Sequence, residues 1–150
     1  MVNIKTDGTK QTSITEWGIE PELRYFTLSQ GTAQPWVKTW YDARGRKVRT
    51  ESRGEGNVTL LELATYNKKG QVTANVVSNG DLTTSESYTY DNYNRIETEV
   101  RKVDDDTMQF GYSYNSQGLL QSTVYPGNVT VGYAYDGYGK LVSLFRYTHK

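Results

Sequence analysis

The feature that most constrains the fold of this chain is a five-residue phrase that recurs at nearly constant spacing. Tyr41 opens YDARG, Tyr66 opens YNKKG, Tyr90 opens YDNYN, Tyr114 opens YNSQG and Tyr135 opens YDGYG. These phrase tyrosines lie 25, 24, 24 and 21 residues apart. A fixed period of about 20–50 residues indicates an array of one supersecondary unit. The chain is therefore predicted to consist of repeated copies of one small motif.

A sixth, diverged unit precedes the first full phrase, because Trp17 lies 24 residues before Tyr41. Six positions after each phrase aromatic an aliphatic residue recurs, namely Leu23, Val72, Ile96, Leu120 and Leu141. The Tyr41 unit has Lys47 at that place and Val48 one position later. One inserted residue explains both this departure and the longer spacing of 25, so the register holds over six units.

Each phrase contains the residues of a tight turn. Asp or Asn follows the tyrosine, and such a side chain can accept a hydrogen bond from the backbone two residues on. Three residues later comes Gly, or Asn once, and both tolerate positive φ. We expect the tyrosine to end a strand and the turn to follow. The repeat-defining residues are Tyr41, Asp42, Gly45, Tyr66, Asn67, Gly70, Tyr90, Asp91, Asn94, Tyr114, Asn115, Gly118, Tyr135, Asp136 and Gly139.

A second turn signal lies midway between phrases, in GEGN (54–57), SNGD (78–81), VDDD (103–106) and YPGN (125–128). Strand, turn, strand and turn fill one repeat if strands run about six or seven residues. The predicted fold is all-β, an antiparallel meander of repeated β-hairpins with about ten to twelve strands in an open, twisted or curled sheet. Residues 12–147 would form a single domain of about six units, with tails at 1–11 and 148–150.

Alternation along the strands predicts an aromatic row and an aliphatic row. One face carries Met108, Phe110, Tyr112 and Tyr114, and in the next unit Val129, Val131, Tyr133 and Tyr135. The strands that leave each phrase alternate large and small residues, as in Leu120, Ser122 and Val124. We expect cross-strand pairs between the two rows, each worth about 0.2–1 kcal/mol. Because tyrosine offers an apolar ring and a polar tip, Phe110, Tyr112 and Tyr133 are also a possible ligand face, although a packing ladder explains the same rows.

Composition argues against several classes of function. Seventeen basic and seventeen acidic side chains cancel, which leaves no electrostatic footprint for nucleic acid or an anionic membrane. The chain has no cysteine, no stretch of eighteen apolar residues and no apolar core in its first residues, MVNIKTDGTKQTS. Disulfides, thiolate metal sites, membrane insertion and a signal peptide within this chain are therefore not expected. Thirteen tyrosines and fourteen glycines favour strands and turns.

Several individual residues and short stretches could indicate a function, but each has a simpler structural explanation. His149 lies beside the C-terminus, where a tail residue is the simpler interpretation than a general base. The triplet 104–106 lacks the ligand spacing of a calcium loop. Asn57 and Asn128 fit the glycosylation acceptor pattern but stand where turns require Asn. A basic cluster (Arg44, Arg46, Lys47, Arg49 and Arg53) is interrupted by acidic residues and fits a polar outer face. No catalytic set, metal site or cofactor site is predicted, so an enzyme is not expected.

The phrase, followed by Arg, Lys or Gln and an aliphatic residue, resembles the YD repeat of the Rhs family. Stretches such as WYDARGRKVRTES and YAYDGYGKLVSL are similar to the family pattern over residues 41–147. The resemblance implies β-hairpin strips that spiral into a hollow shell in bacterial Rhs toxins, insecticidal toxin complexes and teneurins. Such shells enclose a toxic domain or serve cell-surface contact, and some have been credited with carbohydrate binding. An extracellular or cell-surface location is implied for this chain.

The chain also departs from that family. No Asp-Pro core motif occurs, and six units are too few to close a shell, so we expect an excised segment or a short stand-alone protein without cargo or self-cleavage. The first hypothesis is a structural scaffold of a shell or adhesin, and the second is a module that binds carbohydrate or peptide. Expected partners are further YD repeats or a second copy. The stretch LVSLFRY (141–147) has high β-propensity with only Arg146 as edge protection, which predicts self-association there.

Overall fold

The computed structural model describes residues 2–4, 10–16, 25–31, 36–54, 56 and 58–148. Several residues on which the sequence predictions rest lie outside these ranges, namely Trp17, Leu23, Asn57 and His149. The chain separates into two compact units, Met1–Thr84 and Ser85–Lys150, and each is considered by itself. The prediction of one repeat domain over residues 12–147 stays a prediction.

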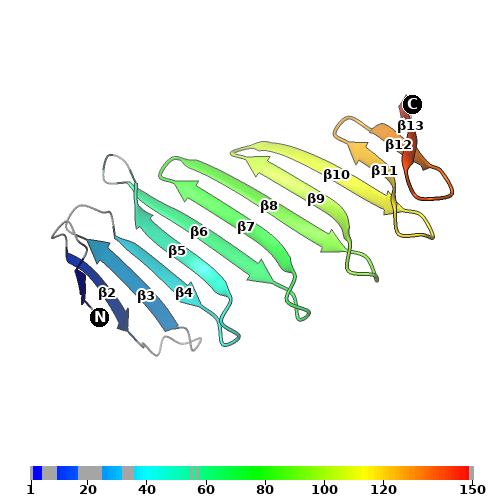
Figure 1. The fold of residues 1–150 in the computed structure, drawn as a ribbon. Coiled ribbons are helices and arrows are strands. Elements are labelled where there is room, and N and C mark those ends of the chain that lie inside the picture. The colour runs from blue at the N-terminus through cyan, green and yellow to red at the C-terminus, as the bar shows by residue number, and fades with distance from the viewer. Residues whose placement is uncertain are drawn as a thin grey trace. The chain divides into compact units, whose positions relative to one another are not determined.

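The first unit is built from antiparallel strands that follow one another in chain order (Figure 1). β1 pairs with β2, and each later strand pairs with the strand before it and the strand after it along the chain. The strands are β1 (Val2–Ile4), β2 (Lys10–Glu16), β3 (Tyr25–Gly31), β4 (Val37–Tyr41), β5 (Lys47–Arg53), β6 (Thr59–Tyr66) and β7 (Val72–Asn79). β1 and the start of β2 lie within the stretch that was predicted to be a tail.

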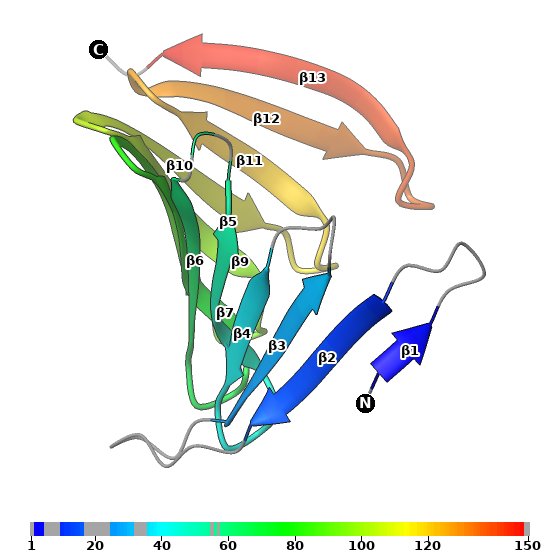
Figure 2. The ribbon, with the colours of Figure 1, turned by 90° about the vertical axis from the view of Figure 1, so that its left-hand side faces the viewer.

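The second unit repeats this arrangement, and Figure 2 shows β11, β12 and β13 side by side with β13 outermost. Its strands are β9 (Ile96–Val103), β10 (Asp106–Tyr114), β11 (Leu120–Tyr125), β12 (Val129–Tyr135) and β13 (Leu141–Thr148), while β8 (Leu82–Tyr90) spans the boundary between the units. The strand order runs from β1 to β13, so the sheet is an open meander. The all-β prediction is confirmed, with thirteen strands in the described residues.

The turns midway between the phrases lie where the second turn signal predicts them. Gly80 has a φ of 65°, Asp104 of 50° and Asn128 of 61°. Glycine and Asx residues are the types that adopt this left-handed region at low cost. Local turn chemistry therefore sets the hairpin ends on both sides of the repeat.

The pairing of the rows differs from the prediction, because the register shifts by one residue beside the phrase tyrosine. In the hairpin of β10 and β11, Tyr114 lies opposite Leu120, but the shift between Ser113 and Tyr114 then places Ser113 opposite Ser122. Further along, Tyr112 lies opposite Thr123 and Gly111 opposite Val124. A shift of one residue exchanges the faces of every following pair. The expected pairing of aromatic and aliphatic rows is therefore wrong beyond the phrase tyrosine itself.

Burial is thin in the described residues. Among residues 26–29, 36–54, 56 and 58–147, Phe26 and Trp40 are the two hydrophobic side chains that are buried, and their ring centroids lie 6.1 Å apart on neighbouring strands. The ammonium of Lys38 lies 3.8 Å from the Phe26 ring centroid and adds a cation–π contact. Thr39, Glu99, Thr123 and Thr130 are also buried. With so small a core, contacts between neighbouring strands and turns become a large part of what stabilises the array.

Candidate functional site

The five phrase turns share one hydrogen-bond pattern around the Asx side chain. In the Asn115 turn, Oδ1 accepts hydrogen bonds from the backbone N–H groups of Gln117 at 3.0 Å and Leu119 at 2.9 Å. The side chains of Asp42, Asn67, Asp91 and Asp136 accept the equivalent two bonds, at 2.8–3.1 Å. The bond from the residue four positions on was not foreseen from the sequence. One side-chain oxygen thus holds both ends of each turn.

Backbone bonds close the same turns. The Asn115 N–H donates to the Leu119 carbonyl at 2.9 Å, and the Gly118 N–H donates to the Asn115 carbonyl at 2.9 Å. All five turns repeat this pair of bonds. The fifth position always has positive φ, with Gly45 at 77°, Gly70 at 91°, Asn94 at 68°, Gly118 at 83° and Gly139 at 80°. Since β-branched residues rarely adopt such φ values, the recurrence of Gly or Asn has a backbone cause.

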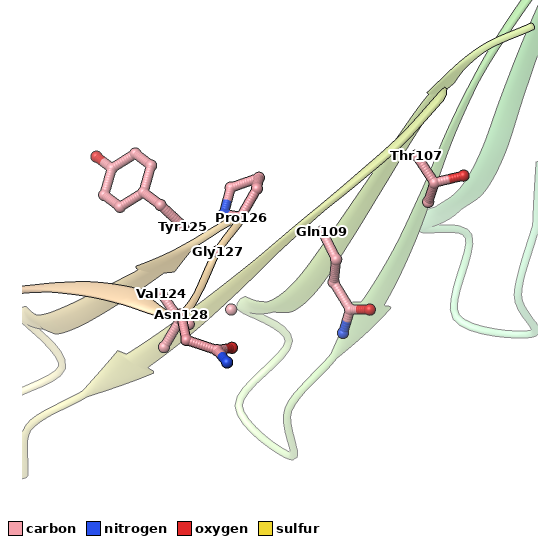
Figure 3. Close-up of a pocket in the computed structure, with 8 residues that line it drawn as sticks. Thr107, Gln109, Val124, Tyr125, Pro126, Gly127 and Asn128 are labelled. Carbon is pink, nitrogen blue, oxygen red and sulfur yellow. The ribbon is translucent and has the colours of Figure 1, made fainter. Parts of the chain in front are cut away.

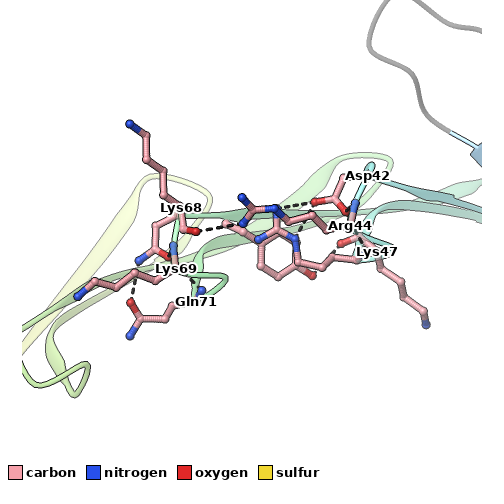
Figure 4. A network of polar contacts seen from close by, with 9 residues as sticks. Asp42, Arg44, Lys47, Lys68, Lys69 and Gln71 are labelled. Atoms are coloured by element: carbon pink, nitrogen blue, oxygen red, sulfur yellow. Dashed lines mark hydrogen bonds and ion pairs between the residues drawn. The ribbon is translucent and has the colours of Figure 1, made fainter.

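In two turns an arginine links the Asx residue to the next repeat. Arg46 forms an ion pair with Asp42, with Nε to Oδ2 at 2.7 Å, and its guanidinium lies 4.4 Å from the ring centroid of Tyr66. Arg44 adds a bond to the Lys68 carbonyl at 3.0 Å (Figure 4). The second unit repeats the first contact, because Arg95 pairs with Asp91 at 2.7 Å and lies 4.1 Å from the Tyr114 centroid.

The phrase tyrosine completes the connection between successive repeats. Tyr66 donates its hydroxyl hydrogen to the Lys47 carbonyl at 2.8 Å, Tyr114 to Ile96 at 2.9 Å, and Tyr135 to Leu120 at 2.9 Å. Each acceptor lies six residues after the preceding phrase tyrosine. We call this contact, from a phrase tyrosine to the preceding repeat, the turn clamp, with the stacked arginine as part of it where one is present.

The charge of the Asx residue in each phrase correlates with the residue four positions later. The sequence contains this correlation, but it was not predicted from the sequence. Where the phrase has Asp42 or Asp91, an arginine stands four residues later and pairs with it. Where the phrase has Asn67, the residue four positions on is Gln71, and the two amides bond at 2.8 Å. Asn115 is followed at that distance by Leu119. Acidic Asx residues therefore carry a cation at the matching position, and neutral ones do not.

The hydrogen bonds and arginine charges within two of these turns also lower the pKa of the Asp side chain. For Asp91, desolvation alone would raise the pKa, but hydrogen bonds from Arg95 and Tyr93 and the charge of Arg95 outweigh it, so the pKa lies below its ordinary value. Asp42 behaves in the same way with Arg46 and Arg44. Both carboxylates are therefore held in the charged form.

The residues of the possible ligand face are engaged inside the second unit. Tyr112 donates to Glu99 Oε2 at 2.7 Å, and the Tyr133 hydroxyl lies 3.3 Å from Thr123 Oγ1. Phe110 packs edge-on against Tyr125, with centroids 5.9 Å apart and an angle of 77° between the rings. Phe110, Tyr112 and Tyr133 therefore all contact other residues of the chain, and a ligand role for them stays a prediction.

A buried carboxylate organises part of this face. Glu99 is 6% exposed and bonds to both Tyr112 and Arg101. Desolvation opposes its charge, but those two bonds and the Arg101 charge lower its pKa below the ordinary value. Two effects raise the pKa of Tyr112 to about 12: desolvation is the larger, and the hydrogen bond to Glu99 is the second. A hydrogen bond to Glu86 likewise raises the pKa of Tyr88 to about 12.

An open hollow of about 550 Å³ lies on the second unit, but it does not coincide with the predicted ligand face. Figure 3 shows Val124 and Asn128 beside the turn that contains Pro126 and Gly127, and Thr107 and Gln109 along β10. Its lining residues are Thr107, Gln109, Gly111, Val124, Tyr125, Pro126, Gly127 and Asn128. The side chains that line the hollow carry hydroxyl and amide groups and no charge.

Within the described ranges, no group of three or more His, Asp or Glu side chains is placed to hold a metal ion. No helix in the same part of the chain is long and apolar enough to span a membrane. The acidic triplet Asp104–Asp106 lies in and beside the turn between β9 and β10, as the simpler interpretation of that stretch expected.

Comparison with protein families matches residues 26–146 to the family described as Teneurin YD-shell. The match spans all five full phrases and the strands between them. The chain belongs to the teneurin YD-shell family. This confirms the resemblance drawn from the phrases and explains why the same turn chemistry recurs. No curated protein matches the chain.

Proposed function

We propose that the chain is a non-catalytic structural segment of a secreted or cell-surface YD-repeat protein, where it serves as the hairpin scaffold of a shell or adhesin. The observation that carries the proposal is the turn clamp. Its recurring bond, from a tyrosine hydroxyl to a backbone carbonyl of the preceding repeat, joins one repeat to the next. A surface that is built from such contacts suits a wall rather than a reactive site.

The distribution of burial supports the same role. A sheet with few buried hydrophobic side chains cannot rely on a central core, so each hairpin depends on its neighbours. An array held by nearest-neighbour contacts can be extended without a change of design, which suits a wall of variable length. The membership of the YD-shell family supports the extracellular or cell-surface setting of the proposal.

The scaffold role can be tested with variants of the clamp. Arg46→Gln and Arg95→Gln remove the charge that pairs with Asp42 and Asp91 and stacks on the next tyrosine. We expect the double variant to lower the thermal midpoint and broaden the unfolding transition. The matched control is Lys102→Gln, at an exposed strand position, which should leave both unchanged.

A second measurement separates the scaffold from a binding module. Purified protein is applied to a glycan array and a peptide library, with Tyr112→Ala and Tyr133→Ala as matched variants. The scaffold proposal expects no saturable binding that depends on these tyrosines. Saturable binding by the unmodified chain that both substitutions abolish would instead assign the tyrosine face to a ligand.

A further inference from the structure

One cross-strand pair recurs at the same place in successive repeats of the sheet. The residue three positions before a phrase tyrosine pairs with the residue ten positions after that tyrosine. Four such pairs are Lys38 with Glu51, Leu63 with Val76, Gly111 with Val124, and Gly132 with Phe145. The two members of a cross-strand pair lie on the same face of the sheet, so their side chains together fill the space above their backbones.

At the pair of Gly132 and Phe145, the phenylalanine ring takes the space that the glycine leaves. A Cβ atom added to Gly132 would lie 2.3 Å from two carbon atoms of the Phe145 ring, which is closer than Cβ contacts in proteins come. The Phe145 ring therefore lies directly on the backbone of Gly132. A glycine in a strand commonly marks such a close approach.

At the pair of Gly111 and Val124, the smaller valine leaves part of the corresponding space open. A Cβ atom added to Gly111 would meet the side chain of Val124 at an ordinary contact distance of 3.6 Å. Val124 is 37% exposed, and both residues line the open hollow of about 550 Å³. The hollow therefore lies where, one repeat later, an aromatic ring is packed on the sheet.

The side chains around Gly111 supply hydrogen-bonding groups to the same hollow. Thr107 and Gln109 alternate with Gly111 along β10, so all three lie on one face of the sheet. Asn128 lies in the turn between β11 and β12, beside Val124 (Figure 3). Hydroxyl and side-chain amide groups both donate and accept hydrogen bonds, as the backbone of a bound peptide requires. The volume of about 550 Å³ is within the range of ligand pockets, about 300–1,000 Å³.

We propose that this hollow is a binding site for an aromatic side chain of a peptide partner, whose ring lies on Gly111 as the Phe145 ring lies on Gly132. The backbone amides of the partner form hydrogen bonds with the side chains of Gln109 and Asn128 beside the ring. Because the lining side chains carry no charge, the site suits a neutral segment of the partner.

This site is separate from the possible ligand face. Phe110 and Tyr112 alternate with Gly111 along β10, so their rings lie on the opposite face of the sheet. The ring of Tyr125 packs against Phe110, with centroids 5.9 Å apart, and so lies on that opposite face as well. The aromatic ring that fills the hollow therefore comes from the partner.

An NMR titration of the nitrogen-15-labelled chain with N-acetyl-L-phenylalaninamide tests the proposal. This probe carries one aromatic ring and two peptide-like amides, and because it is small we expect a dissociation constant of about 1 mM. Saturable shifts are expected at the backbone amides of Gly111, Val124 and Asn128. The matched probe is methyl β-D-glucopyranoside, a neutral ring that carries hydroxyl groups and no aromatic system, which should leave these amides unchanged.

Two substitutions fill the hollow from within the chain. Val124→Phe recreates the pair of Gly132 with Phe145 and should abolish the shifts that the probe produces. Gly111→Ala adds a Cβ atom that the fold accommodates but that occupies the place of the bound ring, so it should weaken binding by about tenfold or more. The matched control is Val142→Phe, the same exchange at an exposed position of β13, which should bind the probe as the unmodified chain does.

Shifts that are absent, or that rise linearly with probe concentration, would overturn the proposal. So would binding that a folded Val124→Phe or Gly111→Ala variant retains at full strength, or binding that Val142→Phe loses. Saturable shifts with the glucoside in place of the phenylalanine derivative would overturn it as well. Circular dichroism checks the folding of each variant, and Gly111→Ala decides alone if Val124→Phe does not fold.

Discussion

Replacement of Asn115 by alanine isolates the contribution of one Asx side chain to the array. Its Oδ1 accepts the N–H groups of Gln117 and Leu119, at 3.0 and 2.9 Å, and no charge takes part. A hydrogen bond of this kind contributes about 0.5–1.5 kcal/mol net, so two contribute about 1–3 kcal/mol. Gln117 is exposed and its N–H can turn to water, whereas Leu119 is half-buried and its N–H is less easily solvated. We therefore expect a loss of about 2 kcal/mol in the free energy of unfolding.

Urea denaturation followed by tryptophan and tyrosine fluorescence measures this loss, with two matched variants. Gln117→Ala changes an exposed side chain in the same turn and should stay within about 0.5 kcal/mol of the unmodified chain. Asn115→Asp retains the accepting oxygen and should recover most of the stability at neutral pH. If Asn115→Ala unfolds together with Gln117→Ala, the side-chain bonds do not stabilise the turn and the reasoning is refuted.

Three further predictions concern pH and backbone conformation. The pKa values of Asp42 and Asp91 are lowered in the folded chain, so their contribution to the free energy of unfolding is present above the unfolded value of 3.8 and is lost as pH falls below it. Asp91→Asn should weaken this acid dependence, measured by circular dichroism. An unaltered pH profile would contradict the pairing of Asp91 with Arg95. The pKa values of Tyr88 and Tyr112 are raised to about 12, so their contribution to the free energy of unfolding is present below pH 10 and is lost as pH rises through 12. Tyrosinate absorbance should show a component that titrates at this high pH and that Tyr88→Phe and Tyr112→Phe remove. If the component persists in both variants, its assignment to these two tyrosines is wrong. Gly118→Val should destabilise more than Gln117→Ala because Gly118 has a φ of 83°, and equal melting temperatures would show that the φ value does not matter there.

The fold could be predicted because its signals are local. Tyr-Asx-x-x-Gly contains both the hydrogen-bond acceptor and the residue that tolerates positive φ, so the turn between β10 and β11 follows from residues 114–118 alone. The pairing of the aromatic and aliphatic rows could not be predicted in this way. It depends on the register shift between Ser113 and Tyr114, a backbone irregularity that no particular residue type marks in the sequence. The prediction assumed that side chains alternate between the two faces without interruption. The shift instead places Tyr112 and Val124 on opposite faces of the sheet.

The clamp was missed for a different reason. The contact of Arg46 with Tyr66 joins residues of successive repeats, and its existence depends on how closely two turns approach. The sequence does contain a trace of it, since arginine follows Asp42 and Asp91 at four residues and is absent after Asn67 and Asn115. The possible ligand face was predicted from the alternation of aromatic residues along the strands. The polar partners of Tyr112 became visible only in the structure, which places Glu99 opposite Phe110.

The central claim is that phrase tyrosines join successive repeats, and hydrogen exchange in Tyr114→Phe tests it most directly. This substitution removes only the hydroxyl that donates to the Ile96 carbonyl. The control is Tyr138→Phe, which removes the hydroxyl of a fully exposed tyrosine at a turn. We predict faster amide exchange in Tyr114→Phe on both sides of the junction, in the first residues of β9 as well as the last residues of β10, and no change in the control. Exchange that is unchanged in β9, or equally altered by Tyr138→Phe, would contradict the claim.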